Sequence, residues 1–213
     1  MNKLKSIFVA NRYFFICFLF LFLTGILLLL TKGKAATFVY LNPYHSWALD
    51  NFFIYFTYLG DGIFSIVVFL ILLYLRRYSQ ATQLMVAFLV SALVAQILKN
   101  LFSMPRPKEF FAPGQYPYFI PQITHVGFSS FPSGHTTSIF ALATLLAIFE
   151  KNKKANSCYL LGALLVGYSR IYLGQHFLGD VLVGSFIGVL LAVLVHWLFI
   201  EKFPSFPRLA RQR

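Results

Sequence analysis

The stretch FLGDVLVGSFIGVLLAVLVHWLFI, residues 177–200, decides the fold of this chain. A helix needs roughly 20 apolar residues to cross the hydrocarbon core of a bilayer, which is about 30 Å thick, and this stretch is long enough. Its one carboxylate, Asp180, stands near its beginning. We therefore expect a transmembrane helix that carries an acidic group at one face of the membrane.

Similar apolar runs recur along the whole chain of 213 residues. Only 11% of the residues are charged, whereas about 25% are charged in a typical soluble domain. Six transmembrane helices are expected, at residues 13–31, 60–77, 81–101, 134–150, 157–173 and 177–200. The sequence thus predicts an all-α integral membrane protein in which residues 1–213 form a single six-span domain.

A further short helix is expected between the first two predicted spans. Asn42-Pro43 is typical of a helix start and Gly60 of a helix end. Trp47 and several Phe side chains lie between them. We expect this segment to form a short helix that lies along the membrane interface.

The basic residues indicate an orientation. The chain carries 18 Lys and Arg against six Asp and Glu, a formal net charge of +12. These bases stand in short clusters between apolar runs, so no nucleic-acid partner is expected. One side of the membrane receives Lys3, Lys5, Arg12, Arg76, Arg77, Lys151, Lys153, Lys154, Lys202, Arg208, Arg211 and Arg213, and the other receives Lys32, Lys34, Lys99, Arg106, Lys108 and Arg170. Because cytoplasmic loops are richer in Lys and Arg, both termini are expected in the cytoplasm.

Polar residues stand at the ends of several predicted spans. They are Lys99, Arg106, Ser133, His135, Arg170, His176 and Asp180. In an antiparallel bundle, the end of an odd-numbered span and the start of the next span lie on the same side of the membrane. We therefore expect these residues to meet at the extracytoplasmic face, where ionisable groups close to the membrane are usually functional.

The expected cluster suits an anion better than a metal ion. Lys99, Arg106 and Arg170 can neutralise a phosphate dianion. Ser133 and Gly134 open a helix whose free backbone N–H groups can bind phosphate oxygens, and glycine allows close approach. Asp180 is the only carboxylate of the cluster, and a two-metal phosphatase needs several. Phosphate binding without a metal or another cofactor is expected.

The two histidines can take different roles. His176 and Asp180 are four residues apart and share one face if the last helix has begun. The carboxylate would then accept a proton from one ring nitrogen and leave the other as a nucleophile. His135 would act as the general acid that protonates the departing oxygen and later activates water.

Together these residues resemble the type 2 phosphatidic acid phosphatase superfamily of membrane lipid phosphatases. The resemblance is carried by three motifs: Lys99-x6-Arg106-Pro107, Pro132-Ser133-Gly134-His135, and Ser169-Arg170-x5-His176-x3-Asp180. It implies a six-helix fold, a phosphohistidine intermediate on His176 and no metal. Vanadium-dependent haloperoxidases have a similar site but are typically larger and soluble. The short, apolar chain therefore resembles the membrane lipid phosphatases of the superfamily more than the haloperoxidases.

The expected substrate is a phosphorylated membrane lipid, with an undecaprenyl-type diphosphate or phosphatidylglycerol phosphate first and a lipid A phosphate next. Short length and the lack of eukaryotic sorting features favour a bacterial cytoplasmic (inner) membrane, with the site facing the periplasm or exterior. Two alternatives are a proton-coupled transporter, which would carry polar residues at several membrane depths, and a non-catalytic lipid-binding relative. The motif residues do not indicate whether the protein is a monomer or an oligomer.

Overall fold

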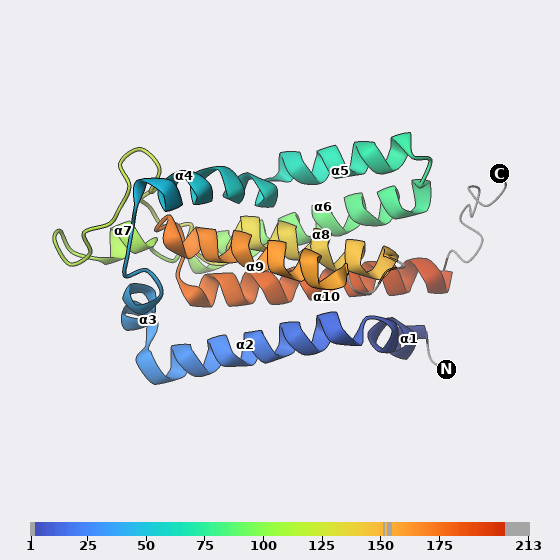
Figure 1. Cartoon of the computed structure of the whole chain (residues 1–213), viewed down its shortest axis with the longest axis horizontal. Helices are drawn as coiled ribbons and strands as arrows, with labels where there is room; N and C mark the ends of the chain where they lie inside the picture. The colour runs from blue at the N-terminus through green and yellow to red at the C-terminus, as the bar shows by residue number, and fades with distance from the viewer. Residues whose placement is uncertain (1–2, 151, 153–154, 203–213) are drawn as a thin grey trace.

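The computed structural model describes residues 3–150, 152 and 155–202, and this part of the chain is helical without a strand (Figure 1). The elements are α1 (Lys3–Ala10), α2 (Arg12–Lys32), α3 (Lys34–Leu41), α4 (Trp47–Phe56), the 3-10 helix η1 (Thr57–Gly60), α5 (Gly62–Tyr74), α6 (Tyr78–Phe102), α7 (Pro107–Phe110), α8 (Gly134–Phe149), α9 (Asn156–Tyr172) and α10 (Leu178–Lys202). The long helices run side by side along one axis, and α1 and α3 lie across it (Figure 1).

Helix α8 is the centre of the bundle. Nearly every residue from Thr136 to Ala147 is buried, and α8 packs against α6, α9 and α10. A helix that is apolar on all sides is stable only when other helices or lipid surround it. The central position of α8 therefore places its N-terminus, with Ser133 and His135, in the middle of one end of the bundle.

Two glycines bring α10 into backbone contact with α8. A Cβ atom on Gly188 would lie 2.5 Å from the carbonyl oxygen of Thr137 and 2.9 Å from the nitrogen of Ala141. A Cβ atom on Gly184 would lie 2.7 Å from the carbonyl oxygen of Ser133. Small residues at helix interfaces allow this approach in membrane proteins. The two helices can therefore lie this close only because Gly184 and Gly188 have no side chain.

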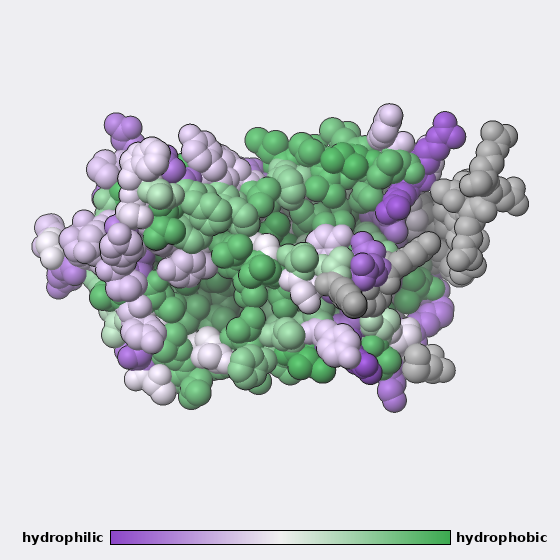
Figure 2. Space-filling model, viewed as in Figure 1, coloured by the Kyte–Doolittle hydropathy of each residue, from purple (hydrophilic) through white to green (hydrophobic). Residues whose placement is uncertain are grey.

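On the face shown in Figure 2, apolar side chains cover the middle of the molecule as a belt, and polar side chains gather at its two ends. Exposed residues of the belt include Leu19, Phe20, Leu23, Leu27, Ile63, Val67, Leu70, Leu89, Leu93, Leu190 and Leu194. A soluble monomer rarely exposes so large a continuous apolar surface. By length and composition, three stretches can cross a membrane, namely α2, α10 and Tyr78–Phe110, which begins with α6, and a fourth if the bent pair Trp47–Gly60 and Gly62–Tyr74 is one span. The predicted all-α fold with membrane-type helices is confirmed at this level.

Five of the expected spans match α2, α6, α8, α9 and α10 to within three residues. The remaining one, expected at 60–77, is the shorter helix α5, and α4 and η1 continue it toward the other end of the bundle (Figure 1). The two parts meet at 55°. The helix breaks at Gly60 and Asp61, where Asp61 adopts an extended backbone and its Oδ1 accepts a hydrogen bond of 3.1 Å from the N–H of Ile63.

The expectation for residues 42–60 therefore needs a correction. The helix begins at Trp47, capped by Ser46, and not at Asn42-Pro43. It lies along the bundle instead of across its end, because Phe53 packs against Tyr168 and Tyr172 of α9 with ring centroids 5.3 and 4.6 Å apart. The element that crosses this end is α3 (Figure 1).

The first and last described helices meet at the end of the bundle opposite α3. Lys3 Nζ forms an ion pair of 3.0 Å with Glu201 and donates a hydrogen bond of 3.1 Å to the carbonyl of Ile200. The turn from α5 to α6 lies at this end too (Figure 1). Several bases of the predicted cytoplasmic set lie outside the described residues: Lys151, Lys153, Lys154, Arg208, Arg211 and Arg213.

Substitution Gly188→Ala should destabilise the protein by about 1–3 kcal/mol, because the added methyl group overlaps the backbone of α8. Thermal unfolding in detergent, followed by circular dichroism, measures the effect. Gly162→Ala is the matched control, since a Cβ atom on Gly162 of α9 meets no heavy atom within 4 Å. Equal melting temperatures for the two variants would contradict the close approach of α8 and α10.

Candidate active site

The N-terminus of α8 forms the floor of the site. Ser133 caps this helix, because its Oγ accepts hydrogen bonds from the N–H and the Oγ1 of Thr136 at 3.4 and 2.8 Å. Around Gly134 there is open space, since an added Cβ atom would meet nothing within 4 Å. His135 is half-buried in the first turn. Free N–H groups at this helix end thus face room for an anion.

Asp180 connects three segments of the chain. Its Oδ2 accepts hydrogen bonds from Ser130 Oγ at 2.5 Å and from the N–H of Phe177 at 2.9 Å. Its backbone carbonyl accepts a hydrogen bond of 3.1 Å from the N–H of Ser133. The carboxylate therefore holds the start of α10, the segment before α8 and the nucleophile candidate in one place.

His176 lies next to this carboxylate, with Nδ1 at 3.6 Å from Oδ2 of Asp180. The last helix begins only at Leu178, so the pair does not share a helix face, as the sequence had suggested. A tight turn brings the two side chains together, in which the N–H groups of Gln175 and His176 donate to the carbonyl of Arg170 at 2.9 and 3.1 Å. Hydrogen bonds of catalytic pairs are often long without substrate and shorten in the complex.

Lys99 and Arg106 are held by a neutral loop residue, Ser129. Lys99 Nζ donates to the Ser129 carbonyl at 3.2 Å. Arg106 donates from Nε and Nη2 to Ser129 Oγ at 3.4 and 3.3 Å. On its other side, Arg106 Nη1 donates to Gln175 Oε1 at 2.7 Å. The two cations of the first motif thus lie beside the segment that leads into His176.

Arg170 enters the site from the end of α9. Its side chain is buried, and its Nη1 donates a hydrogen bond of 2.7 Å to Thr57 Oγ1. Segment η1, which begins with Thr57, also touches His135, because a Cβ atom on Gly60 would lie 3.0 Å from Cβ of His135. Contacts therefore connect the predicted site residues Lys99, Arg106, Ser133, Gly134, His135, Arg170, His176 and Asp180 at one end of the bundle.

Burial controls the charge state in the loops of the site. It lowers the pKa of His176 to about 4, against the raising effect of Asp180, so the imidazole is neutral at neutral pH. Burial also lowers the pKa of Arg106, which Asp180 partly opposes. A neutral imidazole beside a carboxylate and several cations is the state that a nitrogen nucleophile requires.

Four residues of the site were not predicted from the sequence: Thr57, Ser129, Ser130 and Gln175. Each is uncharged, and each contacts a predicted residue through a hydrogen bond. Gln175 also donates to the carbonyl of Ile123 at 2.5 Å, which joins Arg106 to the loop before α8. Only the position of Gln175, directly before His176, could have drawn attention to it.

A second polar network braces the same end of the bundle. His45 Nδ1 lies 2.9 Å from Asp50 Oδ1, which also accepts a hydrogen bond of 2.6 Å from Tyr172. The His45 ring stacks on Tyr172 with centroids 4.2 Å apart. Asn42 donates to the carbonyls of Ile171 and Tyr172 at 3.0 Å each. These bonds fasten the connection between α3 and α4 to the last turn of α9, directly beside Arg170.

A metal ion would need several His, Cys, Asp or Glu side chains close together. Within residues 3–150, 152 and 155–202, no group of three or more His, Cys, Asp or Glu side chains has that arrangement. The cations and hydroxyl groups described above suit phosphate oxygens instead.

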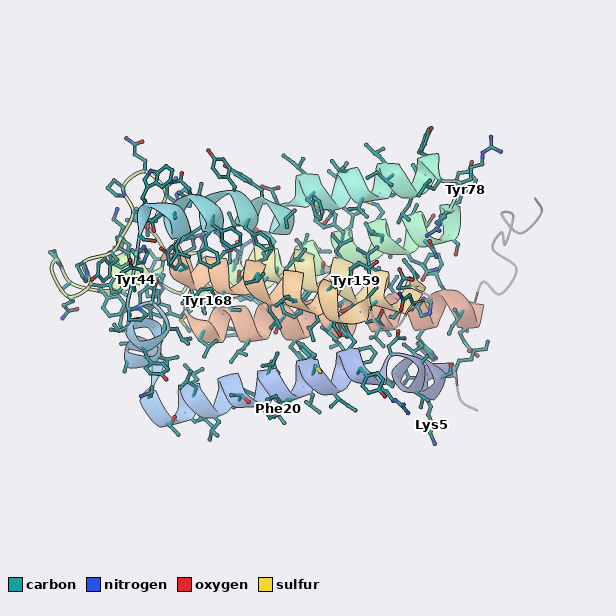
Figure 3. All side chains as sticks on the ribbon, in the orientation of Figure 1. Lys5, Phe20, Tyr44, Tyr78, Tyr159 and Tyr168 are labelled. Carbon is teal, nitrogen blue, oxygen red and sulfur yellow. The ribbon has the colours of Figure 1, made fainter. Side chains whose placement is uncertain are left out.

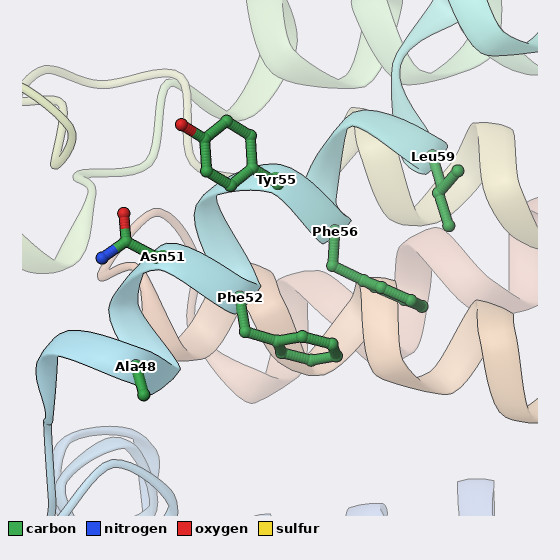
Figure 4. Close-up of a pocket in the computed structure, with 6 residues that line it drawn as sticks. All are labelled: Ala48, Asn51, Phe52, Tyr55, Phe56 and Leu59. Carbon is green, nitrogen blue, oxygen red and sulfur yellow. The ribbon is translucent and has the colours of Figure 1, made fainter.

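An open apolar groove lies on α4 and η1, outside this cluster. It is lined by Ala48, Asn51, Phe52, Tyr55, Phe56 and Leu59 (Figure 4). The rings of Phe52 and Phe56 stack with centroids 5.2 Å apart. The groove ends at η1, the segment that also carries Thr57.

Residues 80–204 match the PAP2 superfamily. The chain belongs to the PAP2 superfamily. The fold agrees, because the crystal structure of Aquifex aeolicus LpxE is similar to this one with a TM-score of 0.68 and 32% sequence identity, over 76% of this chain and 94% of that chain. A second structure, the first transmembrane PAP2 type phosphatidylglycerolphosphate phosphatase from Bacillus subtilis, has a TM-score of 0.65 and 27% identity, and covers 97% of this chain and 100% of that chain.

Similar PAP2 proteins are named as lipid phosphatases. Lipid A 4'-phosphatase of Porphyromonas gingivalis is 30% identical, over 76% of this chain and 71% of its own length. Phosphatidylglycerophosphatase B of Bacillus subtilis is 32% identical, over 70% of this chain and 74% of its own length. The predicted family and the predicted enzyme class, a lipid phosphatase, are confirmed by these comparisons.

One PAP2 relative carries a transporter name. The Bacitracin transport permease protein BcrC of Bacillus licheniformis is 32% identical, over 74% of this chain and 71% of its own length. Undecaprenyl-diphosphatase BcrC of Bacillus subtilis is 30% identical, over 73% of this chain and 76% of its own length. Because a protein of the same short name is a diphosphatase, and the other relatives are phosphatases, the transporter alternative is not favoured.

Proposed function

We propose that this PAP2 protein hydrolyses a lipid phosphomonoester or diphosphate at the extracytoplasmic face of a bacterial inner membrane, through a phosphohistidine intermediate on His176. The observation that carries the proposal is the junction of the His176–Asp180 pair with Lys99, Arg106 and Arg170 at one end of an apolar bundle. A cationic pocket beside a neutral imidazole stabilises a transferring phosphoryl group and supplies its acceptor.

The proposed reaction has two steps. The Nε2 lone pair of His176 attacks phosphorus, and the bond from phosphorus to the lipid oxygen breaks with its electron pair on that oxygen. His135 protonates this oxygen, while Asp180 accepts the Nδ1–H of the developing imidazolium. Water then attacks the phosphohistidine, gives its proton to His135, and the P–N bond breaks to release phosphate and neutral His176.

Phosphate binding is assigned to Lys99, Arg106, Arg170, Ser133 and Gly134. The cations neutralise the equatorial oxygens, and the open space at Gly134 lets the backbone N–H groups of α8 reach them. Neither step involves a metal ion or another cofactor.

The proposed substrates are an undecaprenyl-diphosphate-like or a phosphatidylglycerol-phosphate-like lipid. Relatives named undecaprenyl-diphosphatase and phosphatidylglycerophosphatase support this class. A lipid A phosphate is the second candidate, supported by the Porphyromonas gingivalis lipid A 4'-phosphatase. The apolar groove of α4 suits a hydrocarbon chain, since its lining is mainly aromatic and aliphatic.

The proposed topology has six spans in one domain, with both termini in the cytoplasm. Helix α1, the start of α2, the α5–α6 turn and the end of α10 lie at the end of the bundle opposite the site (Figure 1). These elements carry the described bases of the predicted cytoplasmic set, which supports a cytoplasmic location for that end: Lys3, Lys5, Arg12, Arg76, Arg77 and Lys202. The site then opens toward the periplasm or exterior.

The purified protein should release phosphate from at least one lipid of a panel that contains undecaprenyl diphosphate, phosphatidylglycerol phosphate, lipid A and phosphatidic acid. EDTA should not reduce the rate of this release. Rapid quenching with the labelled substrate should trap an acid-labile, base-stable phosphoenzyme, as a phosphoramidate requires. His176→Asn should lose both the label and turnover. Asn152→Gln, remote from the site in the connection between α8 and α9, is the control for handling and folding.

Label on a carboxylate, or turnover by His176→Asn at the wild-type rate, would contradict the proposed nucleophile. Activity that EDTA abolishes and Mg²⁺ restores would contradict the metal-free reaction. No phosphate release from any lipid of the panel would contradict the proposed function itself.

The pH dependence of kcat/KM should show the low pKa of His176. The nucleophile must be neutral, so activity is present above its pKa and is lost as the pH falls through about 4. An ordinary histidine, with a pKa of about 6.5, would already lose activity below about pH 6. Asp180→Asn should move this limb to lower pH, because the carboxylate raises the pKa of His176, and should reduce kcat roughly 100-fold or more. A wild-type limb near 6.5 would contradict a buried, neutral His176.

Single cysteines at Tyr44 and Tyr78, which lie at opposite ends of the bundle (Figure 3), should differ in accessibility. Both side chains are exposed. In spheroplasts, and in a background without Cys17 and Cys158, a membrane-impermeant thiol reagent should label Tyr44→Cys and spare Tyr78→Cys. The opposite pattern would place the site in the cytoplasm.

A further inference from the structure

The side chain of Arg170 is a buried cation without a buried counter-ion. Its exposed fraction is 7%, and among the described residues no carboxylate lies within ion-pair distance of it. Its Nε is buried and has no hydrogen-bond partner. A buried guanidinium N–H without an acceptor is unfavourable, so this edge of Arg170 is the one that an anionic ligand would complete.

The opposite edge of the guanidinium is fixed by Thr57. Arg170 Nη1 donates a hydrogen bond of 2.7 Å to Thr57 Oγ1, and the Thr57 side chain is buried as well. A guanidinium group is planar, so a bond at Nη1 limits the rotation of the whole fork. The hydroxyl group therefore fixes the orientation of the guanidinium group, including the direction of its Nε edge.

Segment η1 reaches Arg170 because the second helix is broken. A Cβ atom on Gly60 would lie 2.6 Å from Cγ1 of Val166 and 3.0 Å from Cβ and the carbonyl oxygen of His135. Glycine thus lets η1 fit between α8 and α9. Thr57 begins this segment and lies outside residues 80–204, the part of the chain that matches the superfamily.

We propose that Thr57 is a positioning residue for phosphoryl transfer, which acts by orienting Arg170. The inference rests on the proposed function. A neutral hydroxyl suits this role better than a carboxylate does, because an aspartate at residue 57 would form an ion pair with Arg170 and reduce its attraction for the substrate. The phosphoryl group gains charge on its oxygens in the transition state, so the orientation of Arg170 should affect kcat more than KM.

Substitution Thr57→Val tests the role of the hydroxyl, because valine has the same shape without a hydrogen-bonding group. The binding of inorganic vanadate to the detergent-solubilised protein, measured by calorimetry, should weaken about tenfold or more, as expected for the loss of a hydrogen bond to a charged group. With the best lipid substrate, kcat should fall by a similar factor and KM should change less. Thr57→Ser keeps the hydroxyl and should restore both values to within about threefold of the wild type.

Thr144→Val is the matched control. Thr144 is buried in α8, and its Oγ1 donates to the carbonyl of Phe140 in its own helix at 2.7 Å. This variant should bind vanadate and turn over substrate as the wild type does. In the background of Arg170→Lys, Thr57→Val should have no further effect on vanadate binding, because two residues that act through one contact are not additive.

Unchanged vanadate binding and kcat in Thr57→Val would overturn the inference, and so would a Thr57→Ser variant as weak as Thr57→Val. A full tenfold effect of Thr57→Val in the Arg170→Lys background would show that Thr57 does not act through Arg170. Calorimetry needs no turnover, so these outcomes are separate from failure of the proposed function, which is an inactive wild type on the whole lipid panel.

Discussion

The contact of α10 with α8 through Gly184 and Gly188 is the constraint on which the site depends. At Gly184 the α10 backbone passes the carbonyl of Ser133 so closely that a side chain would overlap it. The same approach lets the N–H of Ser133 donate to the carbonyl of Asp180. One helix pair thus places the N-terminus of α8, the proposed anion-binding site, beside the segment that carries His176. In a bilayer the association is stabilised by van der Waals contact rather than by the hydrophobic effect, so the small residues are required.

Asp180 extends this constraint to the loops. With hydrogen bonds from Ser130 and Phe177, its carboxylate fixes the turn before α10 and the segment before α8. Since these bonds are made by Ser130 and Phe177 and not by the His176 ring, the turn would keep its geometry while the ring changes charge in the proposed reaction. The proposed role of Asp180 in orienting His176 is therefore joined to a structural role, and Asp180→Asn tests the first while retaining part of the second.

The sequence predicted the helices and the convergence of the charged residues, because both follow from strong local signals. Apolar runs mark spans, and alternation of antiparallel spans places their polar ends on two sides. The course of α4 was not predictable in this way, since it depends on the packing of Phe53 against Tyr168 and Tyr172 of a helix far along the chain. The contact of Thr57 with Arg170 depends on the same packing. The proximity of His176 to Asp180 was expected for a partly wrong reason, because a tight turn and not a helix face brings them together.

Neutral groups position every cation of the site. Lys99 is held by the Ser129 carbonyl, Arg106 by Ser129 and Gln175, and Arg170 by Thr57. Carboxylates would hold these side chains more strongly, but each would cancel a positive charge that the proposed phosphate substrate needs. Hydroxyl, amide and carbonyl dipoles fix the geometry and leave the charge unpaired until a phosphate binds. This arrangement also explains why Thr57 and Ser129 carried no signal in the sequence, and Gln175 only that of its place before His176. A search for charged or metal-binding residues passes over the neutral residues that hold the cations in place.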